Sequence, residues 1–205
     1  TAEADPQPIL YINDYSILSN AGLDTPHQDG YFKIIKKILD DGAPLGGIGM
    51  QGHFGAQLTS VPKIWQILDR FSEFEKPIQV TEFDIDVDDE ELQGAYTRDF
   101  LTAIFAHRSI AGFMMWGFWE GAHWRPRAAL WNKDWSLRPN GKVWLDLVTK
   151  EWWTNAAGNA DAGGQFSADV FKGDYQVTVM GAGAWGTAFA ALVGRNGAIS
   201  NRSAR

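Results

Sequence analysis

Four short runs of apolar or β-branched residues recur along the chain at similar intervals. They cover 9–13, 47–53, 77–82 and 111–117. Each run begins roughly 30 or more residues after the previous one, which is the repeat length of a strand joined to a helix. The pattern therefore predicts four consecutive βα units.

Apolar residues at helical spacing fill the gaps between these runs, as expected for helices that bury one face against a sheet. The three stripes are Tyr31, Ile34, Ile35, Ile38 and Leu39; Val61, Ile64, Trp65 and Leu68; and Leu92, Tyr96, Phe100, Ile104 and Phe105. A last helix is expected over 141–152. The acidic run 88–91 opens the third helix, where the helix dipole favours negative charge, so we interpret it as capping rather than metal binding.

Polar residues follow the strand runs, at the positions where (β/α) barrels keep their chemistry. They are Asn13 and Asp14, Gln51 and His53, Glu82 and Asp84, and Trp116 and Glu120. Four βα units amount to half of an eight-stranded barrel. The alternative is a small doubly wound sheet whose loop carboxylates face water.

Composition narrows the range of partners. The chain has 205 residues, a net charge of -7 and a pI near 5.0, and an acidic protein is poorly suited to bind nucleic acid or an anionic membrane. Ten Trp residues suit a neutral ligand rich in hydroxyl groups, because sugar rings pack on flat aromatic faces. Cysteine is absent, and neither an apolar run of membrane-spanning length nor an export signal is visible.

Glu82 and Asp84 form the strongest chemical candidate. Glu82 ends a strand run, and Asp84 lies two residues on, so the two side chains are expected on the same side of the strand. His53 ends the preceding run, and its imidazole is expected to bridge the two carboxylates. A His in this position orients a nucleophilic carboxylate and keeps it charged. Retaining cleavage of a glycosidic bond requires such a nucleophile opposite a carboxylic acid.

Four segments together resemble a known family, the xylanases of glycoside hydrolase family ten. They are Leu10-Tyr11-Ile12-Asn13-Asp14-Tyr15, Gly47-Ile48-Gly49-Met50-Gln51-Gly52-His53, Val80-Thr81-Glu82-Phe83-Asp84-Ile85, and Trp116-Gly117-Phe118-Trp119-Glu120 with Trp124. The resemblance implies that these segments are strands five to eight of a TIM (β/α)8 barrel. It also implies secretion and endo-hydrolysis of β-1,4-xylan by a retaining double displacement, with neither metal nor organic cofactor.

The resemblance also implies roles for particular residues. Glu82 resembles the nucleophile, and the other positions fall into three groups: His53 and Asp84 as orienting partners, Gln51 and Asn13 as polar residues that line the site, and Trp116 and Trp124 as aromatic walls of the sugar subsites. Glu120 is a further candidate for substrate binding, at a position where Asp is common in the family. Ser16 also departs from the family, in which Asn is common there.

One expected residue is not found in this sequence. In the family the acid/base Glu ends strand four, which would precede Thr1. The 205-residue chain alone is therefore expected to have little or no activity on xylan, to need the N-terminal half-barrel as a partner, and to dimerise or aggregate through its uncovered edges. A catalytically silent carbohydrate-binding domain is the second hypothesis.

The sequence beyond the predicted barrel, which we place at 1–155, changes character twice. Residues 156–179 alternate apolar and polar positions, which predicts a short β module of two or three strands. Residues 180–205 carry Gly181, Gly183 and Gly186 in a G-x-G-x-x-G pattern and resemble the N-terminus of an NAD-dependent glycerol-phosphate dehydrogenase. The acidic residue expected about 20 positions later is missing, so we predict that this β-α tail is non-functional, and an NAD-binding dehydrogenase fragment is the third and least favoured hypothesis.

Overall fold

The computed structural model describes residues 8–171 and 173–178. Internal contacts divide the chain into two units, Thr1–Lys150 and Glu151–Arg205. The first contains every strand found in the described residues.

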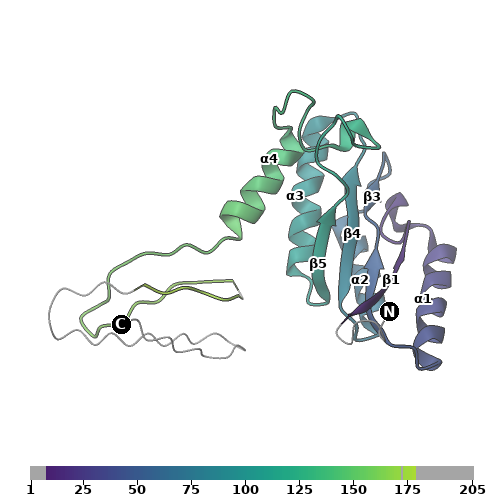
Figure 1. Cartoon of the computed structure of the whole chain (residues 1–205), viewed down its shortest axis with the longest axis horizontal. Coiled ribbons are helices and arrows are strands. Elements are labelled where there is room, and N and C mark those ends of the chain that lie inside the picture. Colours follow the sequence, from purple (N-terminus) through teal and green to yellow (C-terminus); the bar gives the residue numbers. More distant parts are fainter. Residues whose placement is uncertain (1–7, 172, 179–205) are drawn as a thin grey trace. The chain divides into compact units, whose positions relative to one another are not determined.

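The first unit is built on a parallel sheet (Figure 1). Its strands are β1 (Leu10–Asp14), β2 (Leu45–Met50), β3 (His53–Phe54), β4 (Ile78–Ile85) and β5 (Ile110–Met115). All of the pairings are parallel: β1 pairs with β2, β4 pairs with both β2 and β3, and β5 pairs with β4. Spatial order thus follows chain order, as in a barrel, whereas a doubly wound sheet reverses direction at a switch point. The barrel-type prediction is confirmed for this part of the chain.

The predicted single strand over 47–53 is wrong in one respect, because the structure splits it into β2 and β3. Gly52 lies between them and passes close to β4: a Cβ added there would lie 3.0 Å from Val80 Cγ1 and 3.3 Å from Phe83 Cα. Its carbonyl accepts a hydrogen bond from Asp84 N. This close approach places His53 in register with Asp84, next to the C-terminal half of β4.

Four α-helices follow the strands in the described residues, and the three apolar stripes predicted the first three. They are α1 (Thr25–Asp40), α2 (Val61–Ser72), α3 (Glu90–Ala106) and α4 (Pro139–Asp146). The acidic run before α3 does cap that helix, since the Asp89 carboxylate accepts hydrogen bonds from the backbone N–H groups of Glu91 and Leu92. The helix expected over 141–152 begins earlier, with a proline in its first turn, and passes into a π-helical turn over Leu147–Glu151.

Aromatic packing holds β4 against α3. Phe83 of β4 is buried and stacks on Phe100 of α3, with ring centroids 4.8 Å apart and planes within 12°. Phe54 of β3 meets Phe100 edge-on at 5.1 Å. Because Phe83 lies between Glu82 and Asp84 in sequence, its burial fixes the strand from which both carboxylates project.

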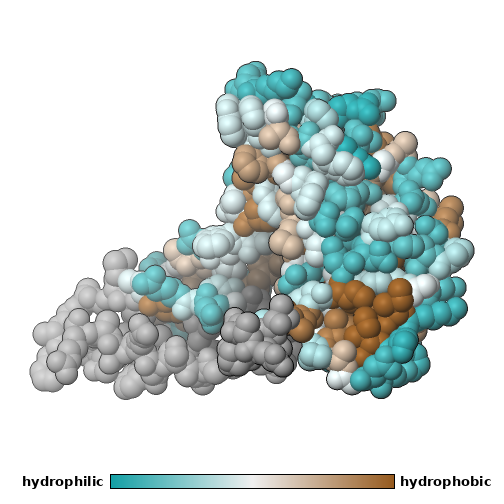
Figure 2. Space-filling view, turned by 45° about the vertical axis from the view of Figure 1, so that its right-hand side comes forward, coloured by the Kyte–Doolittle hydropathy of each residue, from teal (hydrophilic) through white to brown (hydrophobic). Residues whose placement is uncertain are grey.

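The outer edges of the sheet are open within the described residues. In that part of the chain β1 pairs only with β2, and β5 only with β4. Ile9, just before β1, is 66% exposed, and Ile34 of α1 is 51% exposed. Figure 2, which turns the α1 side forward, shows a continuous hydrophobic area on this unit. Open edges beside apolar surface suit coverage by further strands, as the barrel prediction requires.

The described residues of the second unit contain no strand, so the two or three strands predicted for 156–179 are not formed there. Asp161 begins a turn, and its carboxylate accepts hydrogen bonds from the N–H groups of Gly163 and Gln165. Apolar side chains such as Phe166 and Val177 are about half exposed, so no buried face favours a strand ladder. The proposed boundaries at 155 and 179 stay predictions, and 180–205, with its glycine motif, lies outside the described residues.

Candidate active site

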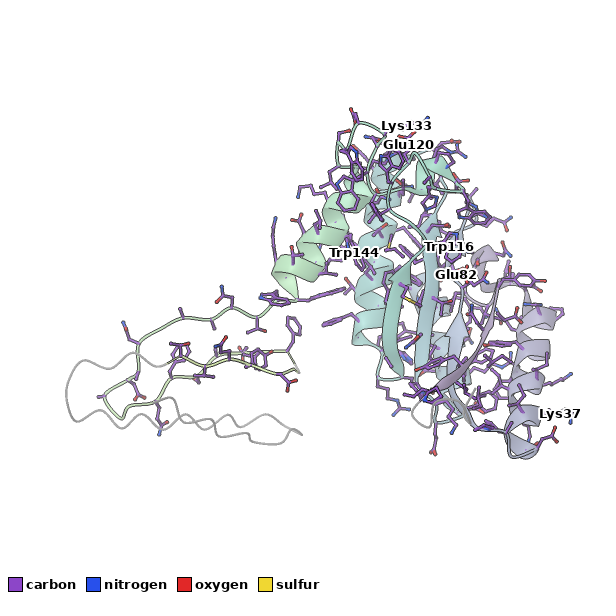
Figure 3. All side chains as sticks on the ribbon, viewed as in Figure 1. Lys37, Glu82, Trp116, Glu120, Lys133 and Trp144 are labelled. Carbon is purple, nitrogen blue, oxygen red and sulfur yellow. The ribbon has the colours of Figure 1, made fainter. Side chains whose placement is uncertain are left out.

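Glu82 projects from β4 near the carboxyl end of the sheet (Figure 3). Its Oε1 accepts a hydrogen bond of 3.3 Å from Asn13 Nδ2, at the end of β1. Thr81 Oγ1 donates to Asn13 Oδ1 at 2.9 Å, which leaves the amide nitrogen of Asn13 facing Glu82. Gly49 of β2 provides room for this amide, because a Cβ at that position would lie 2.6 Å from Asn13 Oδ1.

The second carboxylate oxygen faces the imidazole of His53. His53 Nε2 lies 3.1 Å from Glu82 Oε2, and Nδ1 lies 3.0 Å from Asp84 Oδ2. The first contact is aligned as a hydrogen bond; the second has the distance of an ion pair without that alignment. The predicted bridge of the two carboxylates by one imidazole is therefore present in the structure.

Protonation of His53 depends on opposing effects. Partial burial alone would lower the pKa of His53, but Asp84 and then Glu82 favour the imidazolium and raise that pKa above its ordinary value overall. A protonated imidazole would hydrogen-bond Glu82 through Nε2 and attract Asp84 through charge. The raised pKa thus favours a proton on the imidazole that lies between the two acidic groups.

Asp84 is the fully buried member of this cluster, with no exposed side-chain surface. Its Oδ2 accepts a hydrogen bond of 2.7 Å from Trp124 Nε1, and its Oδ1 lies 3.6 Å from Arg125 Nη1. Arg125 also donates to the carbonyl of Phe54 at 3.2 Å and covers the ring of Trp124 at 4.3 Å. A buried carboxylate needs such partners, and here they attach the 124–125 loop to β3 and β4.

Trp116 and Trp124 form exposed aromatic surfaces beside this polar cluster. They are 45% and 56% exposed. Both meet the ring of His53 edge-on, with centroids 5.9 Å and 4.8 Å away. Flat indole faces next to a fixed carboxylate suit a pyranose ring, which presents C–H groups to the ring face and hydroxyl groups to the polar side.

The structure also places the remaining predicted residues. Gln51 follows β2 directly, and its N–H donates to the carbonyl of Asp14 at the carboxyl edge of the sheet. Glu120 does not join Glu82: its carboxylate accepts a hydrogen bond from Lys133 N and pairs with Arg138 at 3.3 Å. Figure 3 shows Glu120 beside Lys133, apart from Glu82 and Trp116. Glu120 therefore stabilises the loop before α4.

Three contributors were missed by the sequence reasoning: Thr81, His123 and Arg125. His123 is buried, which lowers its pKa, and its Nδ1 accepts a hydrogen bond from Arg125 N. It packs against Gly117, whose φ of 87° favours glycine. The adjacent Trp124 and Arg125 could have indicated a cation packed over an indole ring. Their acidic partner, Asp84, could not be identified in this way, because it lies 40 residues from Trp124 in sequence.

No group of three or more His, Cys, Asp or Glu residues within 8–171 and 173–178 has the arrangement of a metal site. An open hollow lined by Asp69, Glu73 and Arg108 lies near the residues that precede β4 and β5. Because that is the opposite end of the sheet from Glu82, the hollow is separate from the site.

Fold and site together define a portion of a (β/α) barrel whose strand ends carry a buttressed carboxylate beside exposed tryptophans. The comparison with protein families agrees with this class. Residues 1–145 match glycosyl hydrolase family 10, and the chain belongs to this family.

Two curated relatives each match most of the chain. The chain is 33% identical over 179 residues to endo-1,4-beta-xylanase 2 of Arabidopsis thaliana, covering 87% of this chain and 16% of the relative. It is also 33% identical over 180 residues to the anti-sigma-I factor RsgI6 of Acetivibrio thermocellus, covering 86% of this chain and 22% of that protein. The chain thus spans about a fifth of these relatives. The alignment with the Arabidopsis xylanase covers 87% of the chain, which is more than residues 1–145. This alignment therefore reaches into the second unit.

Solved structures show the same fold. Xylanase 10B from Thermotoga petrophila RKU-1, in complex with xylobiose, superposes with a TM-score of 0.63 at 24% identity, covering 73% of this chain and 49% of that one. The intracellular xylanase TsXylA from Thermoanaerobacterium saccharolyticum JW/SL-YS485 gives 0.60 at 25% identity, covering 69% and 45%. The chain corresponds to about half of each solved xylanase.

Proposed function

We propose that this chain forms the part of a retaining endo-1,4-β-xylanase that carries the nucleophile, Glu82. The main support is the arrangement of its carboxylate. One oxygen accepts from Asn13 and the other faces His53, so the group is held in one rotamer at the carboxyl edge of parallel strands. Membership of family 10 and the exposed tryptophans beside the site agree with a xylan substrate.

In the proposed reaction a Glu82 oxygen attacks the anomeric carbon of the bound xylose. The bond to the leaving-group oxygen breaks, and that oxygen takes a proton from a carboxylic acid on the other face of the sugar. Water, deprotonated by the same group, then attacks the glycosyl-enzyme ester and releases Glu82. No redox partner or metal is needed for this balance.

His53 and Asp84 are positioning residues in this scheme. The imidazole faces Glu82 Oε2 and so limits rotation of the carboxylate, while buried Asp84 favours a proton on His53. When His53 is protonated, its charge weakens attack by Glu82 slightly but favours the later departure of Glu82 from the ester. Orientation within a fixed site is the larger benefit, because misplacement by about 1 Å can cost on the order of 10²-fold in rate.

We further propose that the general acid comes from barrel strands outside residues 1–205. Glu120, the alternative within this sequence, is engaged by Lys133 N and Arg138 in the loop before α4. Without proton donation the chain alone loses roughly 10²–10⁴-fold in rate on xylan. Glycosides with acidic leaving groups escape this loss, because their departure needs no proton.

This difference provides the test. A 2-deoxy-2-fluoro-xylobioside with a dinitrophenolate leaving group is incubated with the 205-residue chain, and the adduct is mapped by mass spectrometry. We expect a covalent adduct on Glu82, none in the Glu82→Gln variant, and little hydrolysis of unactivated xylan. Adduct formation on another residue, or xylan turnover at the rate of whole xylanases, would overturn the assignment.

A catalytically silent carbohydrate-binding domain is the second candidate. It is favoured by one relative, since the protein named anti-sigma-I factor RsgI6 matches over 86% of this chain. The two candidates differ in one result: calorimetric binding of xylo-oligosaccharides without any adduct on Glu82 identifies the binding domain.

Location stays a prediction. Secretion is what the family resemblance implies, yet one similar xylanase is described as intracellular. Within the described residues, the helices are too short or too polar to span a bilayer. We propose an extracellular site of action, which detection of the native protein in culture supernatant would test.

A further inference from the structure

A second aromatic surface lies in the loop between β5 and α4. Trp119 and Trp135 stack with centroids 5.5 Å apart and planes within 12°. Trp135 is 60% exposed although one face rests on Trp119, so its other face is open to solvent. Phe118, 54% exposed, extends this surface with its ring 6.4 Å from Trp135. We call Trp119 and Trp135 the indole platform.

Contacts of Trp119 with its own loop hold the platform in place. The ring of Trp119 covers Gly121 so closely that a Cβ there would lie 2.1 Å from it. Trp119 Nε1 also donates to the carbonyl of Lys133 at 3.3 Å. Trp119 thus contacts Gly121 closely and stacks on Trp135, which makes it a support for the exposed ring.

A tight turn presents Trp135. Its N–H donates to the carbonyl of Asn132, and Asp134 accepts hydrogen bonds from both the N–H and the hydroxyl of Ser136. Trp135 itself has a φ of 66°, the left-handed region that bulky residues rarely adopt. Glycine would relieve this strain, so the turn gives up stability while it exposes a large indole. Strain of this kind is concentrated at ligand-binding positions.

We propose that the indole platform is a secondary binding site for a β-1,4-xylan chain, outside the Glu82 cleft. An open indole face suits stacking, and xylopyranose, which lacks a hydroxymethyl group, can offer C–H groups from either face. The carboxylates of Glu120 and Asp134, which accept hydrogen bonds within the same loop, are acceptors for the hydroxyl groups of a sugar. Figure 3 shows Glu120 and Lys133 well apart from Glu82. The choice of xylan rests on the proposed function.

The test is affinity electrophoresis of the 205-residue chain in native gels with soluble arabinoxylan. Trp135→Gly removes the ring and the backbone strain together, so its melting temperature should stay within a few degrees of the parent. We expect this variant to bind arabinoxylan roughly three- to tenfold more weakly. Trp135→Phe should recover part of the binding, and Trp116→Ala reports on the cleft.

Other outcomes overturn the inference. If Trp135→Gly is retarded as strongly as the parent while Trp116→Ala is not, binding belongs to the cleft alone and the proposed function stands. If the parent itself is not retarded, xylan is the wrong occupant, and adduct formation on Glu82 tests the proposed function separately. If Trp135→Gly changes only self-association in sedimentation, the platform contacts a second copy of the chain.

Discussion

Trp124→Phe isolates the contact between the aromatic loop and buried Asp84. The substitution keeps a ring edge-on to His53, whose centroid lies 4.8 Å away. It removes the Nε1 donor that makes a 2.7 Å hydrogen bond to Asp84 Oδ2. Packing and sugar-facing surface thus change little, whereas a fully buried carboxylate loses one of its partners.

The expected loss follows from the geometry. A hydrogen bond to a charged group contributes about 1.5–3 kcal/mol. Because Trp124 is 56% exposed, water can reach the vacated position, and His53 and Arg125 still face Asp84. We therefore expect about 1.5–2 kcal/mol at the low end of that range, which corresponds to roughly 3–8 °C in melting temperature for a unit of this size.

Unfolding in urea, followed by circular dichroism at a helical wavelength, measures this loss without relying on tryptophan emission. Trp153→Phe is the matched control, because Trp153 is 70% exposed and belongs to the second unit. The cost of Trp124→Phe should also shrink when it is combined with Asp84→Asn, because the acceptor is then neutral. Equal stability of Trp124→Phe and the control, or an unchanged cost of Trp124→Phe in the double variant, would refute the reasoning.

Two further predictions concern the cluster around Glu82. The pKa of His53 is raised in the fold, so the contribution of His53 to stability is complete below its unfolded pKa and is lost as pH rises through the folded value. The difference in melting temperature between the parent and His53→Gln should therefore be larger at about pH 5.5 than at about pH 8.5. Equal differences at the two pH values would contradict this. Gly49→Ala should displace Asn13 and slow adduct formation on Glu82 several-fold, whereas Gly30→Ala, with open space around it, should leave the rate unchanged.

Periodicity was sufficient to predict the elements of the first unit. Apolar stripes located α1, α2 and α3, and β-branched runs located four strand positions, because burial on one face imposes a repeat that sequence records directly. The separation of β3 from β2 was not predictable in this way. It results from the close approach of Gly52 to β4, a distance between backbones that leaves no periodic signal.

The candidate site was predictable where residues share a strand or end neighbouring strands, and not where a loop returns to it. Glu82, His53 and Asp84 came together as expected from strand ends. Glu120 did not, because Arg138, further along the same loop, pairs with its carboxylate. Attachment of Arg125 to Asp84 escaped notice for the same reason: ion pairs across long loops depend on the loop path.

Under the proposed function, this chain positions Glu82 by itself, whereas the general acid comes from strands outside residues 1–205. β1 supplies Asn13, β3 supplies His53, and β4 supplies both carboxylates. The hydrogen-bonding partners of the proposed nucleophile therefore come from strands of this chain, and they do not depend on the opposite side of a barrel. A general acid must approach the sugar from the face opposite Glu82, so its position does not depend on the contacts that hold Glu82. The rate on aryl xylosides should accordingly fall steeply as the leaving group becomes more basic, far more steeply than in an enzyme whose acid is in place.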